Sequence, residues 1–388
     1  QYLGRSQIRA ADFKSLAELP SEALLLAGFR ETVFVRLRNY IYQELVKVHE
    51  SDTAKHQIKL AEIEVIATKI LGDDKPVHRK LLGDLMSYYR DVLAIKPSAR
   101  MVSALQNKAG EFGEFPSLRQ RIAMKEMEKD SDNGKFGRLL VSFFMGGGKT
   151  ATAFLAKEHV GSKKMLYLCP NSDLVTQTAT RVEKYYKKGK EPSVGTVTTG
   201  MSEATVLENL KKEVVVVPFS MFSANIGKVR LVDLLKSQGF DMVTVDEAHN
   251  ARKDEGRNTD TIYELITGIP DLYEKGHVML LSGDPVPNSP DDIAPQLRIY
   301  DKDTYSEVGS LQSLIRKLDP LKVKNALLKF LLILDEPENW QANTEILYFE
   351  LSEEEQQIYN AILGDSSIPL LRKLEELMLG IKNPSLRD

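Results

Sequence analysis

The 388-residue sequence contains only one cysteine, Cys169, and this scarcity excludes an internal disulfide bond. It fits a reducing compartment. No apolar run is long enough to cross a bilayer, so we expect no membrane association. Acidic and basic residues nearly balance, at 55 and 52, and the net charge of −3 gives no overall basic footprint. Charge alone therefore does not predict a nucleic-acid partner, although a basic groove can lie on an acidic molecule.

Internal repeats and low-complexity linkers are also missing from the sequence. The length predicts two or more domains. Residue 1 is Gln and no signal-like stretch follows it, so we expect the chain to be a piece of a longer protein. We expect the protein to be cytoplasmic in a prokaryote, which is the preferred hypothesis, and nuclear in a eukaryote.

The first hundred residues carry apolar side chains at helical spacing. Residues 21–50, 53–71 and 77–95 show this pattern, and the stretch GDDKP at 72–76 separates the last two runs. We predict a small helical domain over residues 1–100 that serves as a packing appendage. A protein partner that docks on these helices is the alternative hypothesis, since nothing in them is typical of catalysis.

From about Ser117 onward, short apolar runs alternate with helical segments. This alternation predicts an α/β domain with a doubly wound parallel sheet, in which ligands bind at the carboxyl ends of the strands. Buried parallel strands are almost continuously apolar. Six runs fit that description: RLLVSFF, KKMLYLC, VGTVTT, EVVVVPF, DMVTVD and HVMLLSG.

A glycine-rich loop follows the first of these runs. Glycines let successive backbone N–H groups approach phosphate closely, and the next helix adds the positive end of its dipole. We predict that Lys149 reaches the β- and γ-phosphates of ATP and that the Thr150 hydroxyl binds Mg²⁺. The alternative is a glycine turn with an incidental lysine, because Phe143 stands where the full phosphate-loop pattern has its first glycine. The predicted nucleotide-binding residues of the loop are Met145, Gly146, Gly147, Gly148, Lys149, Thr150 and Ala151.

An acidic strand end supplies the second motif, in MVTVDEAHN at residues 242–250. We predict that Asp246 holds Mg²⁺ and that Glu247 orients and polarises the attacking water, so that these two residues and Lys149 form the catalytic set. The alternative is an acidic strand end that caps the next helix. A similar run, LLILDEPE at 331–338, is interpreted as structural because no LSGGQ-like signature precedes it.

Together these motifs resemble the superfamily-two helicases, specifically the DEAH-containing Swi/Snf-type DNA translocases. Three further stretches resemble successive motifs of the first RecA-like lobe in that family, namely LYLCPNSDLVTQ, VVVVPFSMF and LLSGDPVPNS. TEILYFELSEEEQQIYNAIL at 344–363 resembles the segment that follows the lobe. The resemblance implies a RecA-like ATP-binding lobe over residues 101–340 and a helical linker over 341–388 that leads to an absent second lobe.

The resemblance also implies roles for individual residues. Gln120 is the candidate for reading adenine, and Arg119 is the alternative candidate. A further alternative is that Gln120 is a residue of the helix surface with no role in binding. Contacts with the phosphates of a tracked DNA strand are implied for Asn171, Ser172, Gln177, Pro218 and Ser220. Coupling of nucleotide state to lobe movement is implied for His249, Ser282, Gly283 and Asp284, the last of which replaces the threonine usual in the family.

The implied activity is ATP hydrolysis that drives movement on double-stranded DNA and remodels protein–DNA complexes. No second-lobe element of the QxxxRxxRxxQ type appears, so we expect this chain alone to be weakly active or inactive. Two alternatives stay open. One is a strand-separating helicase or the translocating subunit of a restriction or defence system, and the other is a non-hydrolysing, nucleotide-gated DNA-binding module.

Overall fold

The computed structural model describes residues 41–42, 44–45, 53–71, 76–106, 112–128, 137–143, 146–252, 257–285, 290–300 and 331–333. The chain divides into two compact units, residues 1–338 and 339–388, and every described residue lies in the first. The predicted linker over 341–388 therefore lies outside the described residues, and the predicted domain boundaries stay predictions.

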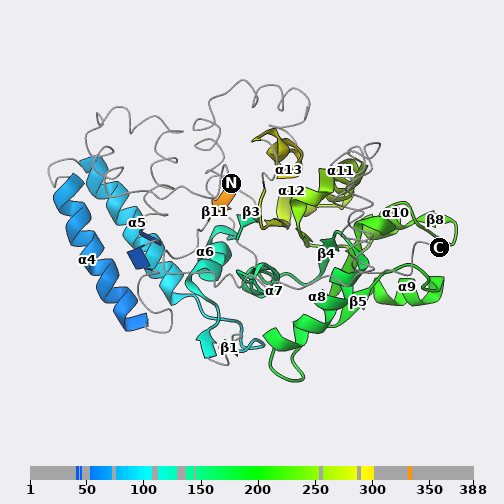
Figure 1. The fold of residues 1–388 in the computed structure, drawn as a ribbon, viewed down its shortest axis with the longest axis horizontal. Helices are drawn as coiled ribbons and strands as arrows, with labels where there is room; N and C mark the ends of the chain where they lie inside the picture. The colour runs from blue at the N-terminus through cyan, green and yellow to red at the C-terminus, as the bar shows by residue number, and fades with distance from the viewer. Residues whose placement is uncertain are drawn as a thin grey trace, which may run out of the picture. The chain divides into compact units, whose positions relative to one another are not determined.

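Two long helices precede the sheet, as the apolar spacing predicts. They are α4 (Thr53–Leu71) and α5 (Pro76–Ala94), and they run side by side in Figure 1. On α5, Leu85, Met86 and Tyr89 are fully buried. These side chains belong to the same hydrophobic cluster as the first helix of the α/β lobe, so α5 is packed on that lobe.

The lobe is built on a seven-stranded sheet in the order β11-β3-β10-β9-β4-β6-β5, with every pair parallel. Six of its strands are the six apolar runs, and this confirms the predicted doubly wound, RecA-like α/β class. The seventh strand comes from the start of the run LLILDEPE, whose acidic residues lie outside the described part. The strands are β3 (Gly137–Ser142), β4 (Met165–Cys169), β5 (Val194–Thr196), β6 (Val214–Pro218), β9 (Met242–Val245), β10 (His277–Ser282) and β11 (Leu331–Ile333).

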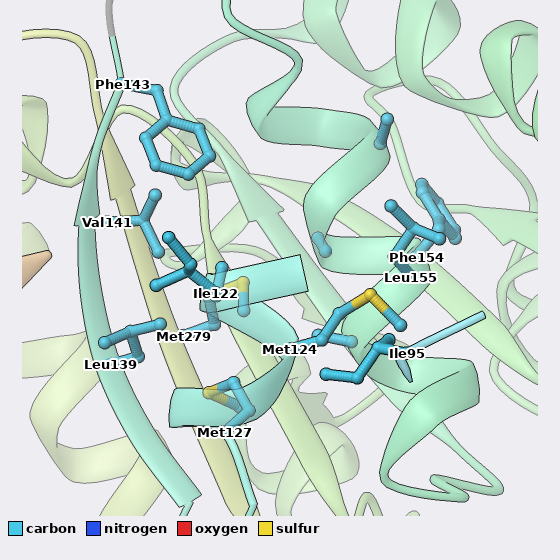
Figure 2. Close-up of a cluster of buried hydrophobic side chains, with 14 of the residues drawn as sticks. Ile95, Ile122, Met124, Met127, Leu139, Val141, Phe143, Phe154, Leu155 and Met279 are labelled. Carbon is cyan, nitrogen blue, oxygen red and sulfur yellow. The ribbon is translucent and has the colours of Figure 1, made fainter. Parts of the chain in front are cut away.

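Helices cover both faces of this sheet, because successive side chains of a strand point to opposite faces. On β3, Leu139 and Val141 belong to a cluster that includes side chains of α6, α7 and α8, whereas Leu140 belongs to one that includes side chains of α10, α11 and α13. Figure 2 shows the first of these clusters, in which Ile122 of α6 lies beside side chains of β3 and β10. The helices are α6 (Leu118–Glu126), α7 (Lys149–His159), α8 (Ser172–Tyr185), α9 (Glu203–Asn209), α10 (Leu231–Lys236), α11 (Arg257–Gly268), α12 (Leu272–Lys275) and α13 (Ala294–Tyr300).

Short elements complete the described part of the lobe. The strands β1 (Ala104–Gln106) and β2 (Phe112–Glu114) pair antiparallel, as do β7 (Asn225–Ile226) and β8 (Val229–Arg230). Three 3₁₀ helices follow strand ends or precede a helix: η1 (Phe219–Met221), η2 (Ala248–Arg252) and η3 (Pro290–Ile293). None of the helices in the described ranges combines the length and the apolar content needed to cross a membrane.

The strand register places the two predicted motifs at one edge of the sheet. Ser142 at the end of β3 lies level with Ser282 of β10, and Val245 at the end of β9 lies level with Leu168 of β4. Because the strands are parallel, the loops that follow β3, β9 and β10 leave the sheet on the same side. The fold therefore brings the glycine-rich loop, the acidic strand end and the serine of β10 together.

The only cysteine of the chain offers a measure of how tightly β4 is packed. Cys169 is fully buried, and burial raises the pKa of its thiol to about 12. Because the thiolate is the reactive form, we expect iodoacetamide at pH 8 to label the folded protein on the order of 100-fold more slowly than the protein in urea. Mass spectrometry of timed samples measures the two rates, and equal rates would contradict the packing of β4 described here.

Candidate nucleotide-binding site

The glycine-rich loop joins β3 to α7. Gly146 and Gly148 have φ values of 85° and 83°, in the left-handed region that favours glycine. Gly148 is the residue before the first helical residue, Lys149. The first N–H groups of a helix have no partner within the helix, so the amides that open α7 are available to an anion. Of the predicted loop residues, Met145 lies outside the described residues.

The side chain of Lys149 lies between the ends of β3 and β9. Its Nζ is 3.5 Å from the carbonyl oxygen of Phe143, to which it donates, and 3.4 Å from Oε1 of Glu247. Only 10% of the Lys149 side chain is exposed. Among the described residues this ammonium group has one carboxylate partner, and groups of this kind form charge-assisted hydrogen bonds with carboxylate or phosphate oxygens. Ala151 is buried in the core, so only its backbone is placed to serve a ligand.

Asp246 follows β9 directly and is buried, with 6% of its surface exposed. Its Oδ1 accepts the backbone N–H of Glu247 at 3.0 Å, and its Oδ2 accepts the hydroxyl of Tyr167 at 2.7 Å. Burial raises the pKa of the Asp246 carboxyl, while the hydrogen bond from Tyr167 acts in the opposite direction. The carboxyl group is thus held by two donors on a fixed strand end.

Glu247 has a left-handed backbone, with a φ of 46°. This conformation is uncommon for a residue with a Cβ, and such strain tends to occur at functional sites. Its carboxylate lies beside Lys149 through Oε1, and its Oε2 accepts the backbone N–H of Gly283 at 3.3 Å. The Glu247 side chain therefore connects Lys149, at the end of the glycine-rich loop, with the loop that follows β10.

His249 connects the acidic end of β9 with the end of β10. Its Nδ1 lies 2.9 Å from Oγ of Ser282 and 3.4 Å from Oε2 of Glu247. Ser282 is fully buried at the end of β10, and Gly283 and Asp284 follow it. The four residues that the resemblance associates with coupling thus lie in or beside one loop, next to the predicted catalytic glutamate.

Gln120 lies on α6 and is buried, with 5% of its surface exposed. Its Oε1 accepts the backbone N–H of Ser117 at 3.0 Å, and its Nε2 donates to the carbonyl of Gly148 at 3.4 Å. A Cβ added to Gly148 would come within 2.7 Å of that Nε2. The Gln120 side chain therefore links α6 to the glycine-rich loop. Adenine reading by Gln120 or by the neighbouring Arg119 stays a prediction.

The residues present fit Mg²⁺ by the chemistry of their donor atoms. Mg²⁺ prefers oxygen ligands and is usually held by one or two protein groups together with phosphates and water. The Asp246 carboxylate and the Thr150 hydroxyl would provide such oxygens, and the carboxylate is held by the Tyr167 hydroxyl at 2.7 Å. Among the described residues no group of three or more His, Cys, Asp or Glu side chains forms a separate metal site.

The residues predicted to touch DNA lie at the same edge of the sheet or just beyond it. Asn171 caps α8, accepting the N–H of Leu174 through its side chain at 3.0 Å. Asn171, Ser172 and Gln177 are exposed along the start of α8. Pro218, the last residue of β6, is buried, and Ser220 in η1 is exposed. The exposed members could contact a strand, whereas Pro218 could contribute only through its backbone.

Sequence reasoning missed Tyr167. It is a fully buried tyrosine in the otherwise apolar strand β4, and its hydroxyl bonds to a predicted Mg²⁺ ligand. The signal in the sequence is one polar atom within the run MLYLC, because a buried hydroxyl requires a hydrogen-bond partner. The identity of that partner depends on the pairing of β4 with β9, which the sequence does not reveal.

Comparison with known proteins supports the helicase resemblance for one part of the chain. Residues 116–275 match the family model described as "Type III restriction enzyme, res subunit". A search of curated proteins finds no match.

Two solved structures were compared with the chain. The SWI2/SNF2 ATPase core of Sulfolobus solfataricus, solved in complex with dsDNA, is 15% identical, with a TM-score of 0.42, 64% of this chain covered and 55% of that one. A hypothetical ATP-dependent RNA helicase from Sulfolobus tokodaii is 20% identical, with a TM-score of 0.33, 47% of this chain covered and 54% of that one. The chain thus spans little more than half the length of either structure.

The family match includes both the glycine-rich loop and the acidic strand end, and these two motifs meet in the structure. Residues 116–275 of the chain are therefore similar to the restriction-enzyme res-subunit family over the segment that contains both motifs of the candidate site.

Proposed function

We propose that the chain is the ATP-binding lobe of a motor of the Swi/Snf type, which uses ATP hydrolysis to move along double-stranded DNA and to remodel protein–DNA complexes. The observation that carries this proposal is the meeting of Lys149 and Glu247, whose Nζ and Oε1 lie 3.4 Å apart. A lysine from a phosphate loop and a glutamate from an acidic strand end are the parts that phosphoryl transfer requires from such a lobe.

Each residue of the site has a definite task in this proposal. The amides at the start of α7 and Lys149 bind the phosphates, while Thr150 and Asp246 would hold Mg²⁺. The metal, when bound, would neutralise charge on the phosphate oxygens. Glu247 accepts a proton from the attacking water or orients it, and its bond to the Gly283 N–H fixes the position from which it acts.

Turnover by this chain alone is proposed to be weak. In motors of this type an arginine from a second lobe stabilises charge on the transferred phosphate, and it contributes about 10³–10⁵ in rate. The described lobe supplies binding, metal ligands and the glutamate, but the arginine is proposed to come from a second lobe. The chain is therefore expected to bind ATP and to hydrolyse it slowly.

The DNA contacts proposed for the ends of β4 and β6 are to backbone phosphates. Asn171 and Ser172 begin α8, where the helix N-terminus also favours phosphate. Contacts of this kind make binding largely independent of sequence and weaker as salt increases.

The test of the motor hypothesis is the ATPase rate of the protein with its second lobe, measured with duplex DNA, single-stranded DNA, RNA and no nucleic acid. We expect duplex DNA to give the largest stimulation, on the order of tenfold or more, with a steep decline between 50 and 200 mM salt. Stimulation by RNA alone would assign the protein to another helicase class. Absence of turnover in every condition, with nucleotide bound, would favour a nucleotide-gated binding module.

A second candidate function is the translocating subunit of a restriction-type complex. The description of the family model that matches residues 116–275 favours it. Both functions share the ATP site and differ in what is attached to the motor. Cleavage of long duplex DNA that depends on ATP, in a complex with the protein, would establish the restriction function, and remodelling without cleavage would exclude it.

A further inference from the structure

The hydroxyl of Tyr167 lies at a point where two neighbouring strands of the site meet. It donates to Oδ2 of Asp246 at 2.7 Å, so it joins β4 to the end of β9. Thr150, the other predicted Mg²⁺ ligand, lies in the first turn of α7. Tyr167 thus touches one of the two residues that the sequence predicts as Mg²⁺ ligands.

The ring of Tyr167 is held firmly, so its hydroxyl has a fixed position. The side chain is fully buried, and its ring stacks on Phe154 of α7 with a centroid distance of 6.1 Å and an interplanar angle of 9°. The stacking comes from the same helix whose first turn contains Thr150. Helix α7 therefore packs against the ring of Tyr167 and also begins directly after the glycine-rich loop.

The two oxygens of Asp246 have different donors. Oδ1 takes the backbone N–H of Glu247, and Oδ2 takes the Tyr167 hydroxyl. An ionised carboxylate has about four lone-pair sites, so two donors fix its rotation and leave acceptor sites for a metal or for the water bound to it. Without the tyrosine hydroxyl, the backbone N–H of Glu247 would be the one donor among the described residues that orients the carboxylate.

We propose that Tyr167 is a positioning residue of the nucleotide site, whose hydroxyl holds the Asp246 carboxylate in the orientation that receives the Mg²⁺ of a bound nucleoside triphosphate. This inference rests on the proposed function, since it needs the site to bind nucleotide with Mg²⁺. Tyr167 is not a catalytic residue, because it acts through Asp246. Groups that orient a metal ligand in this way typically contribute 10–100-fold to metal affinity.

The test compares the wild-type chain with Tyr167→Phe and Tyr186→Phe. Phenylalanine keeps the ring that stacks on Phe154 and removes only the hydroxyl. Tyr186→Phe is the matched control, because Tyr186 is also buried and its hydroxyl also donates to a carboxylate, Oε1 of Glu158 at 3.1 Å. The probe is a fluorescent, non-hydrolysable ATP analogue, whose affinity is measured in EDTA and over a titration with MgCl₂.

We expect Mg²⁺ to tighten binding of the analogue to the wild-type chain and to the control. In Tyr167→Phe this metal-dependent gain should be smaller by about 10–100-fold, while the affinity in EDTA stays within about threefold of wild type. Tyr167→Met, which fills the same space with a flexible side chain, should lose the gain as well, and this second variant keeps the test decisive if the first does not fold.

Two results would overturn the inference while leaving the proposed function in place. One is a Tyr167→Phe variant with the metal dependence of wild type. The other is a variant whose affinity declines by the same factor with and without Mg²⁺, since a purely structural role predicts that pattern. A wild-type chain that binds no analogue under either condition would instead overturn the proposed function, and the inference with it.

Discussion

Replacement of Lys149 by alanine is expected to reduce ATP affinity by at least about 100-fold. The reason is that the ammonium group would no longer bond to phosphate oxygens, and hydrogen bonds to charged groups contribute about 1.5–3 kcal/mol each. In the absence of nucleotide the same group has a carboxylate partner 3.4 Å away, and 10% of the side chain is exposed. Titration with a fluorescent ATP analogue in the presence of Mg²⁺ measures the change.

The matched control for this variant is Lys188→Ala, because Lys188 is an exposed lysine of the same lobe, beyond the end of α8. It should bind the analogue as wild type does. Thermal unfolding of both variants separates a binding defect from a folding defect. Nucleotide affinity that is unchanged in Lys149→Ala would mean that the glycine-rich loop is a structural turn, and the ATP site would have to lie elsewhere.

Replacement of Glu247 by glutamine is expected to stop turnover while nucleotide stays bound. Glutamine has nearly the same shape, and its side-chain oxygen can still accept the N–H of Gly283, which Oε2 of Glu247 accepts at 3.3 Å. It cannot take a proton from water, and loss of a general base costs about 10²–10⁴ in rate. The change is best measured as the steady-state ATPase rate of a protein that includes the proposed second lobe, in the presence of duplex DNA.

Affinity for the ATP analogue should remain within about threefold of wild type in this variant, because Lys149 and Asp246 are untouched. Glu208→Gln is the control, since Glu208 is an exposed glutamate that pairs with Lys211 and Lys212 far from the site. A normal rate in Glu247→Gln would assign the base to another group. A rate and an affinity that decline together would indicate that the loop has lost its structure.

The fold class could be predicted because its signal is local. Strands buried on both faces of a parallel sheet are continuous apolar runs, and the glycine-rich loop and acidic strand end each occupy a few consecutive residues. The six predicted strands are all present. The order of the strands could not be predicted, because parallel neighbours such as β3 and β10 come from distant parts of the chain and share no short-range pattern.

The same distinction holds within the site. Residues with a characteristic neighbourhood, such as Lys149 and Glu247, could be picked from the sequence, and the structure brings them together. Gln120 and Tyr167 were harder, because their contacts depend on where α6 and β4 pack. The left-handed backbone of Glu247 carries no signal in the sequence, since glutamate normally avoids that conformation.

The position of β3 within the sheet has a consequence for biosynthesis. Its two neighbours are β10 and β11, both of which follow it in the chain, and the second of them begins at Leu331. A nascent chain that has emerged from the ribosome only as far as α8 therefore has no partner for this strand on either edge. Contacts between such distant segments form slowly and leave apolar surface exposed in the interval. Strand β3, which leads into the glycine-rich loop, can therefore pair on both edges only after most of the lobe has been synthesised.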